Sequence, residues 1–149
     1  DPDQQIQQAI RLLFESFTQL GSVMAVVKKF NTEHLLFARR IRRGIGKGDL
    51  LWGALEHTRV IQILHNPRYA GAFVYGRTLV AVPELRPTSL KVARDDWQVL
   101  IPDAHIGYIN WQEFEHNQVK LRNNALSFSA TNRGSVAREG SALLQGLVI

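Results

Sequence analysis

One arginine, one glutamine and one histidine lie at three-residue spacing in a short segment, residues 58–66, whose sequence is Thr-Arg-Val-Ile-Gln-Ile-Leu-His-Asn. At 100° per residue, a helix here would place its polar side chains on one arc: Arg59, Gln62, His65 and Asn66. The opposite arc would be aliphatic: Val60, Ile61, Ile63 and Leu64. Arg and Gln side chains match guanine and adenine edges in a DNA major groove, so Arg59, Gln62 and His65 are candidate base contacts of a recognition helix. A merely solvated surface helix is the alternative.

Local signals mark both ends of this helix. Thr58 is a candidate N-cap, and the helix is expected to end at Asn66 because the residue before proline is disfavoured in the α region. Four polar residues near the helix are candidate phosphate contacts: Thr58, Arg68, Tyr69 and Arg77.

A basic cluster precedes the helix on a glycine-rich segment. Residues 37–79 contain eight Lys or Arg against two acidic residues, a net charge of +6 that exceeds the +5 of the whole chain. Guanidinium groups pair bidentately with phosphates, counterion release strengthens such binding, and arginine-rich arms can enter a minor groove. These properties favour double-stranded DNA as the partner. The candidate contacts of this cluster are Arg39, Arg40, Arg42, Arg43 and Lys47.

Two helices are expected ahead of these residues. Asp3 is a plausible N-cap of the first, Gly21 its left-handed stop, and Ser22 the cap of the second. Apolar residues recur at helical spacing through both helices. From Asn31 to His57 this periodicity fails, which predicts a loop or a small hairpin, in which Trp52 is interpreted as a core anchor.

Short extended runs over residues 72–77, 79–82 and 97–101 predict a small antiparallel sheet. Asn110 then caps a long helix, with Glu113 completing a capping box. The expected inner row of this helix, Trp111, Phe114, Leu121 and Ala125, is interrupted by Gln118, and we expect the helix to lie against the sheet. The predicted fold class is α+β, with a helix-turn-helix-like helical unit followed by a small antiparallel sheet and a C-terminal helix.

Composition limits the other functions. The 149 residues suit one ordinary core, no apolar run approaches a membrane span, and a cytoplasmic location is expected. Disulfides and thiolate metal sites are excluded because the chain has no cysteine. The five histidines show no metal-site spacing, and no serine lies in a Gly-x-Ser-x-Gly elbow. We therefore predict no catalytic residue, metal or cofactor in this chain.

Three motifs in succession resemble the recombinase domain of the large serine recombinases, which include phage integrases and transposon resolvases. The first is His-Asn-Pro-Arg-Tyr-Ala-Gly-Ala-Phe-Val-Tyr-Gly-Arg, residues 65–77. The second is Trp111-x-Glu113-Phe114-x-x-x-Gln118-x-x-Leu121. The third runs from Arg138 to Val148, and the tryptophan at position 52 also matches the family.

The resemblance implies a DNA-binding domain, residues 1–126, that recognises part of an attachment half-site and positions an N-terminal catalytic domain absent from this chain. It implies that this piece is not itself an enzyme, whereas the parent protein exchanges DNA strands through phosphoserine intermediates together with other recombinase subunits. The small polar residues 127–142 are interpreted as a flexible linker. The apolar residues 143–149 would begin a zinc-binding domain.

Two other readings of the chain stay open at this stage. It could be a basic protein-interaction module, or a phosphodiester enzyme whose site is not recognised.

Overall fold

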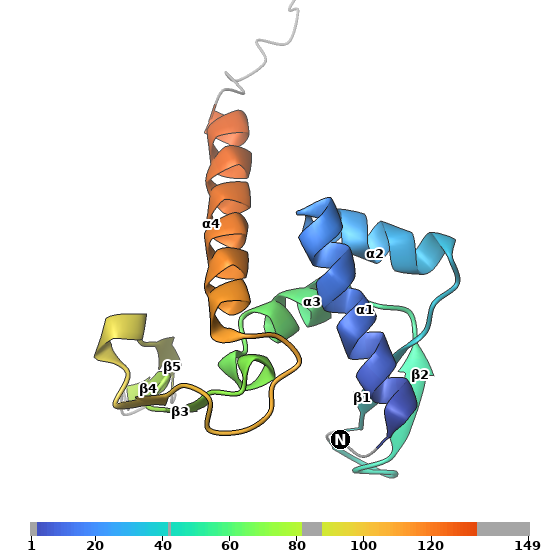
Figure 1. Ribbon diagram of the computed structural model, residues 1–149, viewed down its shortest axis with the longest axis horizontal. Coiled ribbons are helices and arrows are strands. Elements are labelled where there is room, and N and C mark those ends of the chain that lie inside the picture. The colour runs from blue at the N-terminus through green and yellow to red at the C-terminus, as the bar shows by residue number, and fades with distance from the viewer. Residues whose placement is uncertain (1–2, 42, 82–87, 134–149) are drawn as a thin grey trace, which may run out of the picture.

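The computed structural model describes residues 3–41, 43–81 and 88–133. A helical body forms the N-terminal half, small β-ribbons flank it, and a long C-terminal helix stands beside it (Figure 1). The predicted α+β class is confirmed.

Helices α1 (Gln4–Leu20) and α2 (Val23–Thr32) meet at a tight turn. Asp3 caps α1 as predicted, because its Oδ1 accepts hydrogen bonds from the backbone N–H groups of Gln5 at 2.8 Å and Ile6 at 3.4 Å. Gly21 ends α1 in the left-handed region, with φ 66°. Ser22 occupies the N-cap position of α2, but its side chain makes no capping hydrogen bond.

Helix α3 (His57–Leu64) packs its aliphatic face against α1 and α2. Val60, Ile63 and Leu64 are at most 1% exposed, which confirms the predicted buried face, while Ile61 is only partly buried. The predicted N-cap is wrong: Glu56 holds that position in extended conformation, so Thr58 already lies inside the first turn. The helix ends before Pro67, as predicted.

The segment between α2 and α3 forms a hairpin of β1 (Phe37–Arg40) and β2 (Leu50–Gly53). Phe37 and Ala38 of β1 are buried. Trp52, which pairs with Ala38, is 37% exposed, so its interpretation as a core anchor is wrong. The reason is its strand: β1 packs on α1 as well as on β2, whereas the main contacts of β2 are with β1.

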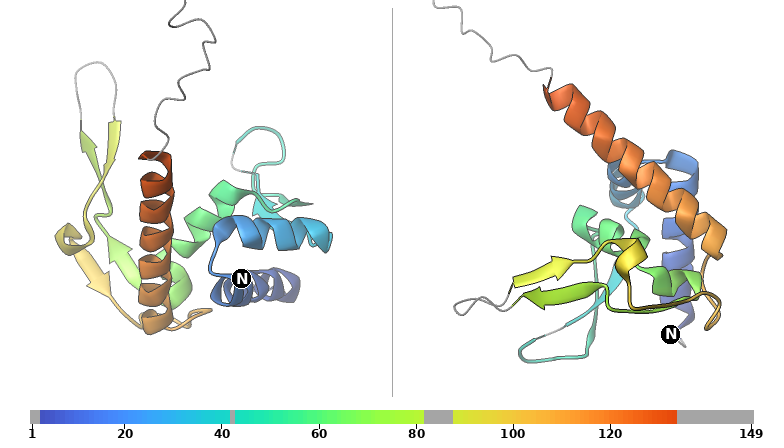
Figure 2. Two further views of the ribbon diagram at one scale, coloured as in Figure 1. Left: turned by 90° about the horizontal axis from the view of Figure 1, so that it is seen from above. Right: turned by 90° about the vertical axis from the view of Figure 1, so that its left-hand side faces the viewer.

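A 3-10 turn, η1 (Pro67–Ala70), follows α3 and leads into short strands. β3 (Phe73–Tyr75) pairs antiparallel with β6 (Val99–Ile101), and β4 (Thr78–Ala81) pairs antiparallel with β5 (Thr88–Lys91); η2 (Arg94–Asp96) lies between β5 and β6 (Figure 2). The predicted antiparallel pairing is present, but as separate two-stranded ribbons rather than one sheet. Strand β5 was not predicted.

Helix α4 (Trp111–Arg133) begins with the predicted capping box. The Glu113 N–H donates to Asn110 Oδ1 at 2.7 Å, and the Asn110 N–H donates to Glu113 Oε2 at 3.2 Å. We expected this helix to lie against the sheet. It packs instead against η1 and α3. Gln118 explains the difference, because its Nε2 donates to the Leu64 carbonyl at 2.7 Å, at the end of α3.

Two further side chains of α4 fasten it to the end of α1. Lys120 Nζ donates to the Thr18 carbonyl at 3.2 Å, and Asn124 Nδ2 donates to the Gly21 carbonyl at 2.7 Å. These carbonyls are at the C-terminus of α1, where backbone acceptors lack partners within the helix.

The predicted linker begins too early. Residues 127–133 continue α4, and Ser127 Oγ donates to the Asn123 carbonyl one turn back at 2.9 Å, which lets a serine fit within a helix. The rest of the predicted linker and the apolar residues 143–149 lie outside the described residues.

The assignment of the two faces of α3 can be tested by truncation. Leu64→Ala is expected to lower the free energy of unfolding by about 2–5 kcal/mol, because a fully buried side chain is replaced by a cavity. Gln62→Ala, on the exposed face of the same helix, is the control and should change it by no more than about 0.5 kcal/mol. Urea unfolding followed by circular dichroism measures both, and equal losses would contradict the assignment.

Candidate nucleic-acid interface

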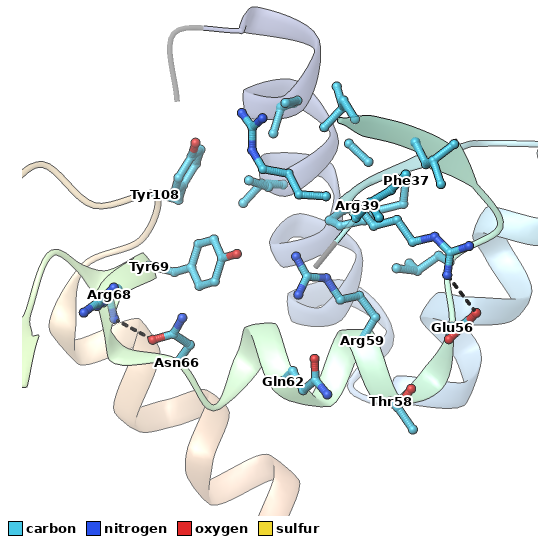
Figure 3. A pocket seen from close by; sticks show the side chains of 18 of the residues that line it. Phe37, Arg39, Glu56, Thr58, Arg59, Gln62, Asn66, Arg68, Tyr69 and Tyr108 are labelled. Carbon is cyan, nitrogen blue, oxygen red and sulfur yellow. Dashed lines mark hydrogen bonds and ion pairs between the residues drawn. The ribbon is translucent and has the colours of Figure 1, made fainter. Parts of the chain in front are cut away.

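A groove of about 1050 Å³ lies between α1, the β1–β2 hairpin, α3, η1 and the loop of residues 105–108 (Figure 3). Aliphatic side chains of α1 and the hairpin line part of it, and α3 contributes its polar face. The groove brings together seven of the predicted DNA-contacting residues: Arg39, Arg40, Thr58, Arg59, Gln62, Arg68 and Tyr69.

The groove is positively charged. Among the described residues that line it are four arginines and one acidic residue, Glu56, a net charge of +3. Arg39 Nη1 lies 4.0 Å from Glu56 Oε1, but both side chains are largely exposed, so this ion pair is weak. Arg40 Nη1 donates to the Gly48 carbonyl at 3.1 Å, which helps to orient its side chain. The net charge of the groove suits an anionic ligand.

Of the four arginines that line the groove, Arg59 is partly buried and the other three are exposed. The Nε of Arg59 is buried and has no hydrogen-bond partner in the structure. In Figure 3 its guanidinium group and the Tyr69 hydroxyl point toward one another across the groove. A buried donor without a partner is destabilising by about 1–3 kcal/mol, and an acceptor atom on a ligand would remove that cost.

Aromatic rings form the other wall. The Tyr69 ring centroid lies 5.8 Å from those of both Phe14 and Tyr108, so Tyr69 is held between α1 and the loop. Backbone bonds fix the same contact, because the Tyr69 carbonyl accepts from the N–H groups of Tyr108 at 2.7 Å and Ile109 at 3.2 Å. The side chain of Asn66 caps η1 by accepting from the Arg68 N–H at 3.3 Å.

His65 and Arg77 do not line the groove. His65 Nδ1 donates to Gln118 Oε1 at 2.6 Å, and the His65 carbonyl accepts from Arg77 Nη2 at 3.1 Å. The Arg77 guanidinium also lies 5.6 Å from the centre of the Trp97 ring. Burial, and secondly the charge of Arg68, lower the pKa of Arg77 from its ordinary value. Both residues join parts of the fold, and their contact with DNA stays a prediction.

Two further basic candidates, Arg43 and Lys47, lie in the turn of the hairpin. Both are exposed there and do not line the groove, and Arg42 lies outside the described residues. The groove also contains residues that sequence reasoning missed: His105, Ile106 and Tyr108. They lie about forty positions after α3, and the only local signal was the glycine between Ile106 and Tyr108.

Two kinds of feature are absent from the part of the chain that the structure describes. No group of three or more His, Asp or Glu side chains there is arranged to hold a metal ion. No helix there combines the length and hydrophobicity needed to cross a membrane.

Comparison with known proteins assigns the chain to a family. The profile of the family described as Recombinase matches residues 4–124. A curated relative from Sinorhizobium fredii (strain NBRC 101917 / NGR234), "Uncharacterized protein y4bA/y4pH", is 61% identical over 150 residues, which cover 100% of this chain and 22% of the relative. No solved structure matches. The family match includes every described residue that lines the groove. Because the match covers most of the sequence, the chain belongs to the Recombinase family.

Proposed function

We propose that this chain is the DNA-binding domain of a site-specific serine recombinase. It recognises part of an attachment half-site in double-stranded DNA and positions a catalytic domain, supplied by the longer protein, for strand exchange. The observation that carries the proposal is the groove of net charge +3, whose four arginines come from β1, α3 and η1. The family match supports the role in recombination.

The exposure of the groove residues suggests which of them supply affinity and which supply sequence preference. Three of the groove arginines, Arg39, Arg40 and Arg68, are exposed, whereas Arg59 of α3 is partly buried, so these three rim arginines would meet a duplex first. Phosphate contacts carry no sequence information, so these residues supply affinity. Arg59 and Gln62 on α3 supply sequence preference, since their side chains match guanine and adenine edges.

The proposal extends to the longer protein. A zinc-binding domain would follow this chain and read the same half-site, and other recombinase subunits would assemble on the DNA. This chain itself would hold no zinc and perform no strand cleavage.

One observation favours a second candidate, a module that binds an acidic protein segment. The groove has aliphatic walls as well as arginines, including Ile6, Ile10 and Leu50, and such a lining also suits an amphipathic peptide. Direct binding measurements distinguish the two candidates. Binding of an acidic amphipathic peptide, without binding of a random duplex or of duplexes selected from random sequences, would favour the second candidate.

The contribution of the rim can be measured through salt. For the variant Arg39→Ala/Arg40→Ala, the slope of log K against log salt concentration is expected to fall by roughly 0.9 for each phosphate that the variant no longer neutralises. Arg122→Ala, exposed on α4 and outside the groove, is the matched control and should keep the wild-type slope. Fluorescence anisotropy with a random duplex measures all three proteins. An unchanged slope in the double variant would refute the assignment of these arginines to phosphates.

Sequence preference should depend on α3. Arg59→Ala is expected to narrow the gap between a duplex selected from random sequences and an unselected duplex by about 1–3 kcal/mol, the worth of one bidentate contact to guanine. Arg68→Ala is the comparison, because removal of an arginine that binds only phosphate should weaken both duplexes equally. The measurement is repeated with the longer protein, in which the following domain reads the same half-site. If Arg59→Ala also weakens binding to the selected and the unselected duplex equally, Arg59 is a phosphate contact.

A further inference from the structure

Ile106 is an apolar side chain in an unusual place. It is 100% exposed, yet it is among the residues that line the basic groove, two positions before Tyr108. A single exposed isoleucine needs no explanation by itself. What distinguishes this one is how firmly its loop is held and what the groove around it carries.

The backbone on both sides of Ile106 is fixed. The His105 N–H donates to the Gly71 carbonyl at 3.0 Å, and the Tyr108 N–H donates to the Tyr69 carbonyl at 2.7 Å. The loop also lies directly on η1: a Cβ atom at Gly107 would be 2.6 Å from the Gly71 nitrogen, and one at Gly71 would be 2.3 Å from the His105 carbonyl oxygen. The loop therefore cannot withdraw without breaking this contact.

A side chain held in this way is prepared for insertion. Ile is β-branched and stiff at χ1, so little rotamer freedom remains to be lost when it is buried in a ligand. The groove beside it holds four arginines, which would draw a phosphate backbone toward it. The faces of the bases are the large apolar surface that a duplex offers, and apolar wedges reach them from the minor groove by unstacking a base step.

We infer that Ile106 is such a wedge: it inserts between two base pairs of the bound duplex and bends the DNA. This inference rests on the proposed DNA-binding function and adds a source of specificity to it. Flexible steps such as TA and CA/TG unstack most easily, so the duplex would be selected partly for its deformability at a step that makes no hydrogen bond with the protein.

The chain supplies a matched control in Ile45. It is the same residue type and is fully exposed, at 103%, but it lies in the hairpin turn between Gly44 and Gly46 and does not line the groove. Comparison of Ile106→Ala with Ile45→Ala therefore separates the effect of losing a wedge from the effect of losing any exposed isoleucine.

The test uses the 149-residue chain and a duplex selected by it from random sequences. End-to-end energy transfer reports bending, and 2-aminopurine placed at successive positions reports unstacking. Wild type and Ile45→Ala are expected to bend the duplex equally and to raise the fluorescence at one step. Ile106→Ala should lose most of both signals and bind roughly tenfold more weakly. Ile106→Met should retain bending, because methionine also acts as a wedge.

A duplex already weakened at that step provides a second readout. An abasic site there lowers the cost of unstacking, so wild type should bind that duplex more tightly than the intact one, whereas Ile106→Ala, which does not unstack the step, should gain much less. The melting temperature of Ile106→Ala should equal that of wild type, since a fully exposed side chain contributes little to folding.

The outcomes distinguish the two proposals. If wild type binds no duplex in a salt-dependent manner, the proposed function fails and the wedge fails with it. If wild type binds but Ile106→Ala bends and unstacks DNA as wild type does, the wedge is wrong and DNA binding stands. If replacing thymine by uracil weakens wild type to the level of Ile106→Ala with bending unchanged, Ile106 contacts a thymine methyl group in the major groove, and the wedge is again wrong.

Discussion

Val60, Ile63 and Leu64 of α3 are buried in the core that α3 shares with α1 and α2, and this burial sets the orientation of the polar face of α3. Rotation of α3 about its axis would expose them, at about 1.5–3 kcal/mol for each side chain. With those three positions inside, the 3.6-residue period of the helix directs Arg59 and Gln62 into the groove. The polar residues are thus oriented by hydrophobic contacts in which they take no part.

A second constraint acts on the opposite wall. Gly71 has φ 74°, a conformation that side-chain-bearing residues rarely adopt, and its backbone touches the loop at Gly107 without room for a Cβ on either residue. This contact joins the loop to η1, and α4 begins only three residues beyond the loop. Because α4 is also fastened to the ends of α1 and α3, the groove walls form one connected structure. Such a framework can hold arginines in place before a ligand arrives.

The groove contains polar groups that the fold pairs only weakly. The Arg39–Glu56 ion pair is long and exposed, and the buried Nε of Arg59 has no hydrogen-bond partner in the structure. By contrast, Arg94, outside the groove, donates to Glu115 at 2.6 Å, a contact that lowers the pKa of that glutamate. Folded proteins tolerate unmatched charges and donors chiefly at functional sites, where a ligand completes them. In our proposal, DNA phosphates and base edges complete these groups.

Features that depend on neighbouring residues were readable in the sequence. The Asp3 cap, the Gly21 stop, the buried face of α3 and the capping box of Asn110 and Glu113 each need only a few adjacent positions. The resemblance to recombinases was likewise carried by short motifs, and the family match confirms it.

The errors and omissions concern contacts between distant segments. Trp52 is exposed because its strand packs mainly on β1, and α4 packs on α3 because the Gln118 side chain finds a carbonyl 54 positions away. The same glutamine binds His65, and Ile106 joins the groove through a glycine contact between segments that are remote in sequence. Hydrophobic periodicity reports which face of an element is buried, but not what covers it. The sequence by itself therefore determined the helices and their faces, whereas the tertiary structure alone decided which polar residues share the groove, because that choice depends on packing between segments far apart in the chain.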